Sequence, residues 1–363
     1  MEYNHMEELG FSEDKQALCT ASGFLSSGNA MKRMCDRFIR NGGRVFDVLT
    51  AYDNIQSYGM DRSDRSSGDA VRTMMPLLKA NGVTDTSMQK FFVDDMSLIP
   101  GSNVIHHIND TMPTMIISEC YEHHSVALCD ALKLPSDSIK STEVSFDSLI
   151  IEKKEARTFR EYASELAKLD VPKITSNDEM SYLDGKDQGI IETVEEILEN
   201  MNDADIMIQA DLTDLVGSKE KVQSVMEMRR RTGVDWCDTA YIGNNATDHT
   251  ALDNVRKSDG LALSFNGDGL AVRGSNVAVM SPNSIAVAVI LSEFYTAGIE
   301  GVFSLISSWD REKLAKKEFS DRHLMNAMLN AFPIKLPEAV IVDDDNVDDM
   351  MKHSERYRRK LNL

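Results

Sequence analysis

Short apolar segments alternate with longer helical segments along most of this chain, and this alternation constrains the fold more than any other feature of the sequence. The apolar segments, each predicted as a β-strand, are 17–21, 114–118, 142–151, 205–209, 238–242, 260–265 and 276–280. Helices are predicted at 123–133, 155–169, 187–202 and 218–232. Strands that alternate with helices usually pair in parallel, because each helix carries the chain back to the start of the sheet. The sequence therefore predicts an α/β fold with a doubly wound, mostly parallel sheet and helices on both faces.

The stretch between the first two predicted strands, residues 29–109, is mostly helical in pattern. Met31, Met34, Cys35 and Phe38 recur at helical spacing. Gly82 follows an apolar helical segment and is typical of a helix end. These residues predict a helical unit inserted into the α/β core.

The C-terminal segment changes in composition after Pro333. An acidic run, DDDNVDDMM, is followed by a basic and polar ending, HSERYRRKLNL. A calcium loop is not indicated, because Asp348 stands at the sixth position, where such a loop requires glycine. The segment predicts either a solvated tail or a terminal helix with charged faces.

The charge of the chain argues against nucleic-acid binding. The sequence has 59 acidic and 39 basic side chains, which gives a formal net charge of −20. Proteins that hold a phosphate backbone do so with clustered Lys and Arg, and the same negative field repels an anionic membrane surface. We therefore expect no nucleic-acid partner and no attraction to such a surface.

Cysteine usage and the most apolar window both favour a reduced, cytoplasmic protein. The five cysteines are odd in number and include no CxxC pair, so no disulfide framework is indicated. The window 284–306 contains Glu293 and Glu300, and its uninterrupted apolar run is only 285–291. A membrane helix needs about 20 apolar residues, so we predict a buried helix here and no membrane insertion. The N-terminus lacks the basic start and apolar run of a signal peptide.

Polar residues gather where three of the predicted strands end. Thr20-Ala21-Ser22-Gly23 follows the first strand, Ser118 ends the second, and the run from Gly243 to Asp248 follows a third. Lys219 and Lys221 lie at the start of the helix that precedes this third strand. In open α/β sheets, ligands and reactions are found at the carboxyl ends of the strands. We therefore expect these residues to share one edge of the sheet.

These segments together resemble the haloacid dehalogenase (HAD) superfamily. The motifs that carry the resemblance are IRNGG at 39–43, SECYEHH at 118–124 and GNNATDHTALDNVR at 243–256, with SFNGDGLAVRGSNVAV at 264–279. Within this superfamily the chain resembles an archaeal branch of phosphoserine-phosphatase-like proteins, some of which bear the name energy-converting hydrogenase A subunit R. The resemblance spans roughly residues 15–310.

The resemblance implies a division of the chain into parts. Residues 1–16 would be a flexible extension, and residues 17–28 and 106–310 would form the HAD-like core, with an insertion at about 135–205. Residues 29–105 would form a helical cap, and residues 311–363 a helical and charged C-terminal extension.

The resemblance also implies roles for the residues at the strand ends. The family's nucleophilic aspartate is replaced by Thr20 and its acid/base aspartate by Ser22. Ser118 matches the residue that holds phosphate, as does Lys221, with Lys219 as the nearby alternative. The positions that hold Mg²⁺ are Asp248 and Asn244, and only the first of these keeps its carboxylate.

Neutral Thr, Ser and Asn oxygens are weak ligands for Mg²⁺, and no base lies next to Thr20 to activate it. We therefore expect a protein without cofactor, in which the catalytic chemistry is lost. It would bind a phosphorylated small molecule or a protein partner, or serve as an accessory protein. The alternative is an Mg²⁺-dependent phosphatase that uses other acids, for example Asp36, Asp47 or Asp53.

Structural roles compete with functional ones at each of these positions. Ser118 is also a suitable helix cap, Lys221 a solvated helix side chain, and Asp248 an N-cap for the helix that follows it. These alternatives stay open at the level of sequence.

Overall fold

The computed structural model describes residues 14–60, 66–176, 181–316, 319 and 321–361. The predicted N-terminal extension, 1–16, lies almost wholly outside these residues.

The core is a seven-stranded sheet in the order β3-β2-β1-β6-β7-β8-β9. Its strands are β1 Gln16–Thr20, β2 Thr114–Tyr121, β3 Ile139–Thr142, β6 Thr239–Gly243, β7 Leu261–Phe265, β8 Val277–Met280 and β9 Glu338–Ile341. The first six in this order pair in parallel, and β9 pairs antiparallel with β8. The predicted α/β class and mostly parallel sheet are confirmed.

Alternating side chains of the strands bury both faces of the sheet. In β1, Ala17 and Cys19 join the apolar cluster with α5 (Val104–Thr111) and α13 (Ile285–Ser307). Leu18, between them, joins the opposite cluster with α10 (Ser218–Thr232) and α11 (His249–Lys257). Successive strand residues point to opposite faces, so helices are required on both sides. Helices α6 (Glu122–Leu132) and α12 (Gly269–Gly274) complete the two layers.

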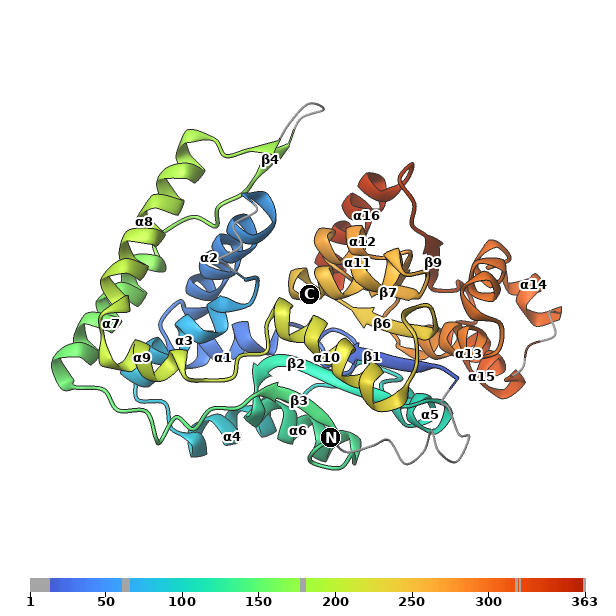
Figure 1. Ribbon diagram of the computed structural model, residues 1–363, viewed down its shortest axis with the longest axis horizontal. Helices are drawn as coiled ribbons and strands as arrows, with labels where there is room; N and C mark the ends of the chain where they lie inside the picture. Colours follow the sequence, from blue (N-terminus) through green and yellow to red (C-terminus); the bar gives the residue numbers. More distant parts are fainter. Residues whose placement is uncertain (1–13, 61–65, 177–180, 317–318, 320, 362–363) are drawn as a thin grey trace.

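The cap is one helical unit built from two inserted segments. The first contributes α1 Ala30–Phe38, α2 Gly42–Asn54, the π-helix η2 Ile55–Gly59, α3 Asp69–Ala80 and α4 Asp85–Asp95. The second contributes α7 Lys153–Leu166, α8 Gly185–Asn202, α9 Asp205–Asp211 and the short strands β4 Thr175–Ser176 and β5 Ser181–Tyr182. A single apolar cluster joins both segments, and they stand together on the left of Figure 1.

The strand predicted at 142–151 is wrong over most of its length. The edge strand β3 covers Ile139–Thr142, and residues 143–152 form no strand. Buried side chains in this irregular segment, including Val144 and Phe146, anchor it in the cap cluster. Asp85 supports it by accepting hydrogen bonds from the backbone N–H groups of Phe146 and Asp147.

The strand predicted at 205–209 is also wrong, because these residues belong to α9. Ile206, Met207 and Ala210 lie on one face of the helix and are buried in the cap. A short apolar run does not show whether its apolar residues repeat with the period of a strand or of a helix. The tertiary contacts therefore decide which of the two forms.

The apolar window predicted as a buried helix is α13. Residues 286–294 are buried on every side, and Gly298 interrupts the helical geometry at φ 64°. Among the described residues, α13 is the one helix long and apolar enough to cross a membrane by length and composition alone. Its first half nevertheless lies in the core between β-strands and α5.

The C-terminal segment belongs to the sheet layer and is not a solvated tail. Helices α14 (Arg311–Lys316) and α15 (Arg322–Ala331) lead to β9, which extends the sheet. The acidic run then starts α16 (Val347–Leu361), which packs on α12 (Figure 1). The terminal helix with charged faces was thus the correct alternative.

Candidate functional site

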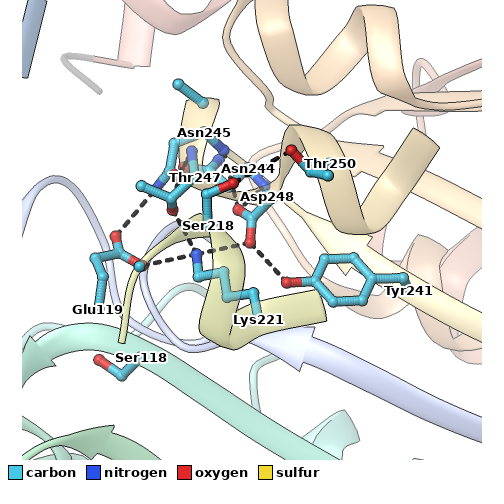
Figure 2. A network of polar contacts seen from close by, with 12 residues as sticks. Ser118, Glu119, Ser218, Lys221, Tyr241, Asn244, Asn245, Thr247, Asp248 and Thr250 are labelled. Carbon is cyan, nitrogen blue, oxygen red and sulfur yellow. Dashed lines mark hydrogen bonds and ion pairs between the residues drawn. The ribbon is translucent and has the colours of Figure 1, made fainter. Parts of the chain in front are cut away.

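Three neighbouring strands bring the expected residues to one edge of the sheet. Thr20 is the last residue of β1, Ser118 lies in the second half of β2, and Gly243 ends β6. Because these strands run parallel, their carboxyl ends meet, and the first turns of α10 place Lys221 at the same edge (Figure 2).

Lys221 is the centre of a buried network. Its side chain has no exposed surface, and its Nζ donates to Asp248 Oδ1 at 2.7 Å, Thr247 Oγ1 at 2.6 Å and Glu119 Oε2 at 3.0 Å. An ammonium group carries three protons. Each of them therefore has a protein acceptor, and none is left to bind a phosphate oxygen. Lys219, the alternative in the sequence, is exposed on the same helix.

Both carboxylate oxygens of Asp248 also have their hydrogen-bond partners within the protein. Its Oδ1 also accepts from the Tyr241 hydroxyl at 2.9 Å. Its Oδ2 accepts from the backbone N–H groups of Asn244 at 2.9 Å and Asn245 at 3.1 Å. The side chain has no exposed surface. Asp248 thus closes the turn that leads into α11 and forms an ion pair with Lys221.

Glu119 is the residue of the network that the sequence analysis missed. Its Oε1 accepts from Asn245 Nδ2 at 2.9 Å, and its side chain is 13% exposed. Ile117, two residues earlier in β2, faces the α10 layer, so strand alternation turns Glu119 to that side and Ser118 away from it. Ser118 Oγ instead accepts from the Cys120 backbone N–H at 3.2 Å. The only sequence signal was an acidic residue in an otherwise apolar strand.

The electrostatics of the network favour the charged forms of Glu119 and Lys221. Burial opposes ionisation of Glu119, but Lys221 and the hydrogen bonds to Glu119 outweigh it and hold its pKa below the ordinary value. Burial alone would lower the pKa of Lys221, but Asp248 and Glu119 reverse this and raise it. Burial, followed by the charge of Asp248, raises the pKa of Tyr241 well above its usual range. The network holds one positive and two negative charges.

Thr20 and Ser22 lie at the edge but make no contact with Lys221 among the described interactions. Thr20 is fully buried, and its Oγ1 has no hydrogen-bond partner within the described residues. The backbone of Ser22 forms a bridge with Ser26. No base therefore lies in hydrogen-bond contact with the Thr20 hydroxyl, as nucleophilic attack would require.

Asn244 fills the space at the turn after β1. Its Nδ2 donates to the carbonyl oxygens of Phe265 at 2.8 Å and Asn266 at 3.1 Å. Gly23, at φ +80°, approaches it so closely that an added Cβ would stand 2.3 Å from Asn244 Cγ. The amide is thus part of the packing between β1, β6 and β7.

These donors do not fit Mg²⁺. Magnesium requires several oxygen ligands in octahedral geometry. Here the one carboxylate among the expected ligands, Asp248, has both oxygens committed to Lys221, Tyr241 and backbone donors. In the described part of the chain, no group of three or more His, Cys, Asp and Glu side chains is arranged to hold a metal.

The acids proposed as replacements lie in the cap and serve its structure. Asp36 Oδ1 accepts from the Gly43 N–H, Asp47 pairs with Lys32, and Asp53 Oδ2 accepts from the Ala70 N–H. None of these contacts reaches the Lys221 network.

The cap is in direct contact with the edge of the sheet. The Tyr58 hydroxyl, from η2, donates to the Ala246 carbonyl at 3.0 Å and lies 3.0 Å from Ser218 Oγ. The Ser218 N–H donates to the Ser67 carbonyl at 2.9 Å, next to a close approach of Gly68 to Gly217. These contacts cover the start of the helix that carries Lys221.

The C-terminal helix α16 supports the same loops from the opposite side. Arg358 Nη1 donates to the carbonyl oxygens of Asn266 at 2.6 Å and Asn244 at 3.3 Å. Ser354 Oγ donates to the Gly267 carbonyl at 2.6 Å. The charged ending of the sequence, which gave no functional signal, therefore positions the loops after β6 and β7.

Comparisons with known proteins show the fold. No family model matches the chain, and no curated protein matches it. Among solved structures, gene product AF1437 from Archaeoglobus fulgidus is similar with a TM-score of 0.77 at 17% identity, over 96% of this chain and 97% of that one. An apo phosphoserine phosphatase has a TM-score of 0.40 at 10% identity, over 78% of this chain and 99% of that one.

A HAD family hydrolase from Salmonella enterica, t0658, is also similar, with a TM-score of 0.36 at 11% identity, over 71% of this chain and 64% of that one. The likeness to AF1437 shows a fold shared across almost the whole chain. The two weaker likenesses decide nothing about the site.

Proposed function

We propose that this chain is a HAD-like protein that acts as a ligand-binding or accessory protein and does not catalyse phosphoryl transfer. The proposal rests mainly on the hydrogen bonds of Lys221. Its ammonium group donates all three protons to Asp248, Thr247 and Glu119, and its side chain is fully buried. The order of the motifs and their meeting at one edge of the sheet support the HAD-like assignment.

Phosphoryl transfer requires a nucleophile and a positive site for the transferred group. In this chain the hydroxyl at the nucleophile position, Thr20, is buried without a base. The charged network next to it holds one cation and two carboxylates, a balance that repels a phosphate dianion. We therefore propose that a ligand or partner binds elsewhere on the protein, and that Ser118 and Lys221 do not hold a phosphorylated molecule.

The remaining finer assignments are part of the same proposal. Membership in the archaeal phosphoserine-phosphatase-like branch and association with a hydrogenase rest on the motif resemblance alone. A cytoplasmic location agrees with five free thiols, four of them buried. The net charge of −20 supports a partner other than nucleic acid.

A phosphatase assay tests the proposal. Purified wild-type protein is offered p-nitrophenyl phosphate and a panel of phosphometabolites, with Mg²⁺ and with EDTA. We expect no turnover above that of the Thr20→Val variant, which serves as the control for contaminating phosphatases. Turnover that EDTA abolishes, and that Thr20→Val lacks, would overturn the proposal.

A restored variant shows how far the site has diverged. Thr20→Asp, Ser22→Asp and Asn244→Asp together return the family's acids. If only the acids are missing, titration calorimetry will detect Mg²⁺ binding that wild type lacks. If binding stays absent in a folded variant, the closure around Lys221 itself excludes the metal.

A further inference from the structure

The cap contains a pocket whose lining residues take no part in the Lys221 network. It has a volume of about 470 Å³ and lies between α7, the turn that joins α1 to α2, and the end of α3. The volume falls within the range of small-molecule sites, about 300–1,000 Å³. The turn contributes Ile39, Arg40 and Asn41, which begin the IRNGG motif that the site at the sheet edge leaves without a role.

One face of α7, continued by the turn after it, forms a wall of the pocket between two cations. Arg160 and Lys168 are these cations. The lining residues between them are all small: Ala163, Ser164 and Ala167. Residues spaced by three and four lie on one face of a helix, and eight residues of helix rise by about 12 Å. The small side chains therefore leave open space between two positive groups, and their spacing suits a ligand with more than one anionic group.

The cations that line the pocket have no carboxylate partner within the described residues. Arg40 and Lys168 form no ion pair there. Arg160 donates from Nη1 to the Ala80 carbonyl at 2.6 Å, and a guanidinium group has further N–H donors. All three side chains are exposed, so a ligand in the pocket can reach them.

The acids near the pocket do not neutralise these cations. Among the described residues, no carboxylate lines the pocket, and Glu165 is exposed on α7 outside the lining. Glu161 pairs with Arg157 at 3.2 Å. Asp170 pairs with Arg44 at 2.9 Å. In a chain with a net charge of −20, the pocket is therefore a local positive site, which favours an anion.

We propose that this pocket binds a small molecule with two or more anionic groups, phosphate or carboxylate, held by Arg40, Arg160 and Lys168. Guanidinium groups bind both kinds of anion through paired hydrogen bonds. Asn41, at φ 55° and with no capping bond from its side chain, adds an amide to the same wall as Arg40. The inference rests on the proposed function as a binding protein, names the ligand class and places the ligand away from the Lys221 network.

Calorimetric titration of the full-length protein with three anions tests this proposal. The probes are pyrophosphate, citrate and inorganic phosphate, at physiological salt in a metal-free buffer. We expect pyrophosphate or citrate to bind, and phosphate to bind at least about fivefold more weakly, because one anionic group cannot engage cations on both sides of the pocket. The tighter of the two polyanions identifies phosphate or carboxylate as the anionic group of the ligand. Binding should weaken as the salt concentration rises.

Variants on exposed positions assign the binding to this pocket. Arg40→Gln and Lys168→Gln each remove one cation and should weaken binding of the tighter polyanion about threefold or more, and together about tenfold or more. Ser164→Phe fills the space between the cations without a change of charge and should abolish binding. Arg157→Gln is the matched control and should bind as wild type does, because it removes one exposed cation from the same helix outside the pocket.

No binding of pyrophosphate or citrate, equal affinity for phosphate, or a loss in Arg157→Gln as large as in the pocket variants would overturn the inference. Unchanged binding in folded Ser164→Phe and in the double variant would overturn it too. These outcomes are independent of the phosphatase assay. EDTA-sensitive turnover with anion binding intact would overturn the proposed function alone, and absent turnover with no anion binding would overturn the pocket alone.

Discussion

Two polar features at the same edge of the sheet, the Lys221 network and the Thr20 hydroxyl, differ in whether their buried groups have hydrogen-bond partners. In the network, the ammonium of Lys221 and both carboxylate oxygens of Asp248 have protein partners, and neither side chain is exposed. At the end of β1, the buried Thr20 Oγ1 has no hydrogen-bond partner among the described residues.

The comparison separates buried groups with a structural role from a buried group without one. Buried charges are tolerated when every partner is present, and such a network holds its elements in one arrangement. A buried hydroxyl without a partner adds no such constraint and costs free energy. Of the residues that the motifs bring to this edge, Lys221 and Asp248 therefore hold the structure together, and the Thr20 side chain does not.

The largest expected effect comes from removing the centre of the network. Lys221→Met leaves Asp248 and Glu119 buried without their cation, which should lower the free energy of unfolding by about 3–5 kcal/mol. Denaturant unfolding measures the loss. Lys219→Met, on the exposed part of the same helix, should change it by no more than about 0.5 kcal/mol. Equal small effects of the two variants would mean that Lys221 is not the structural centre.

The pH dependence of stability should show a smaller effect of the same network. The pKa of Glu119 is lowered in the folded protein, so its contribution is present above the ordinary value of 4.5 and is lost as the pH falls through the folded value. The pKa of Lys221 is raised above 10.5, so its contribution is present below that value and is lost only as the pH rises through the higher folded value.

Unfolding of wild type and Glu119→Gln from pH 7 down to pH 3 checks this expectation, because the glutamine cannot titrate (the pH limits are roughly those over which carboxyl groups titrate). The two stabilities should converge as the pH falls below about 4.5, the ordinary value for Glu119. A difference that stays constant through the acid range would show that the carboxylate adds no stability through its charge.

The smallest expected effect is at Thr20. Thr20→Val replaces a buried hydroxyl that has no described partner, so the free energy of unfolding should stay unchanged or rise by up to about 1 kcal/mol. Thr239→Val is the matched control, because that buried hydroxyl accepts from Gln16 Nε2 and donates to the Asp235 carbonyl. The control should lose about 1–3 kcal/mol in denaturant unfolding. A comparable loss at Thr20 would reveal a hydrogen bond there.

Sequence patterns predicted the core well and the inserted segments poorly. Strands β1, β2, β6, β7 and β8 lie where apolar runs predicted them, because a strand buried on both faces is apolar throughout. The run at 205–209 has the same composition but packs as a helix in the cap. In 142–151, the alternation of buried residues arises from anchoring to the cap and to Asp85, a contact between distant parts of the chain.

The motifs placed Thr20, Ser118, Lys221 and Asp248 at one edge of the sheet but did not predict their bonds. Whether Lys221 or Lys219 turns inward depends on the rotation of α10 against the sheet. Glu119 contacts Lys221 because the alternation of side chains along β2 turns it toward α10. Arg358 reaches the loop after β7 because α16 packs on α12. Each contact joins segments that lie far apart in the chain.

The sequence alone determined the α/β class, the strands β1, β2, β6, β7 and β8 and the polar residues at their ends, because these follow from local apolar patterns and from residue identity. Only the tertiary structure decided that Lys221 is neutralised by Asp248 and Glu119, that two insertions form one cap, and that β9 extends the sheet. The physical reason is that burial and ion pairing depend on which distant side chains meet, and this meeting is set by packing of the whole chain.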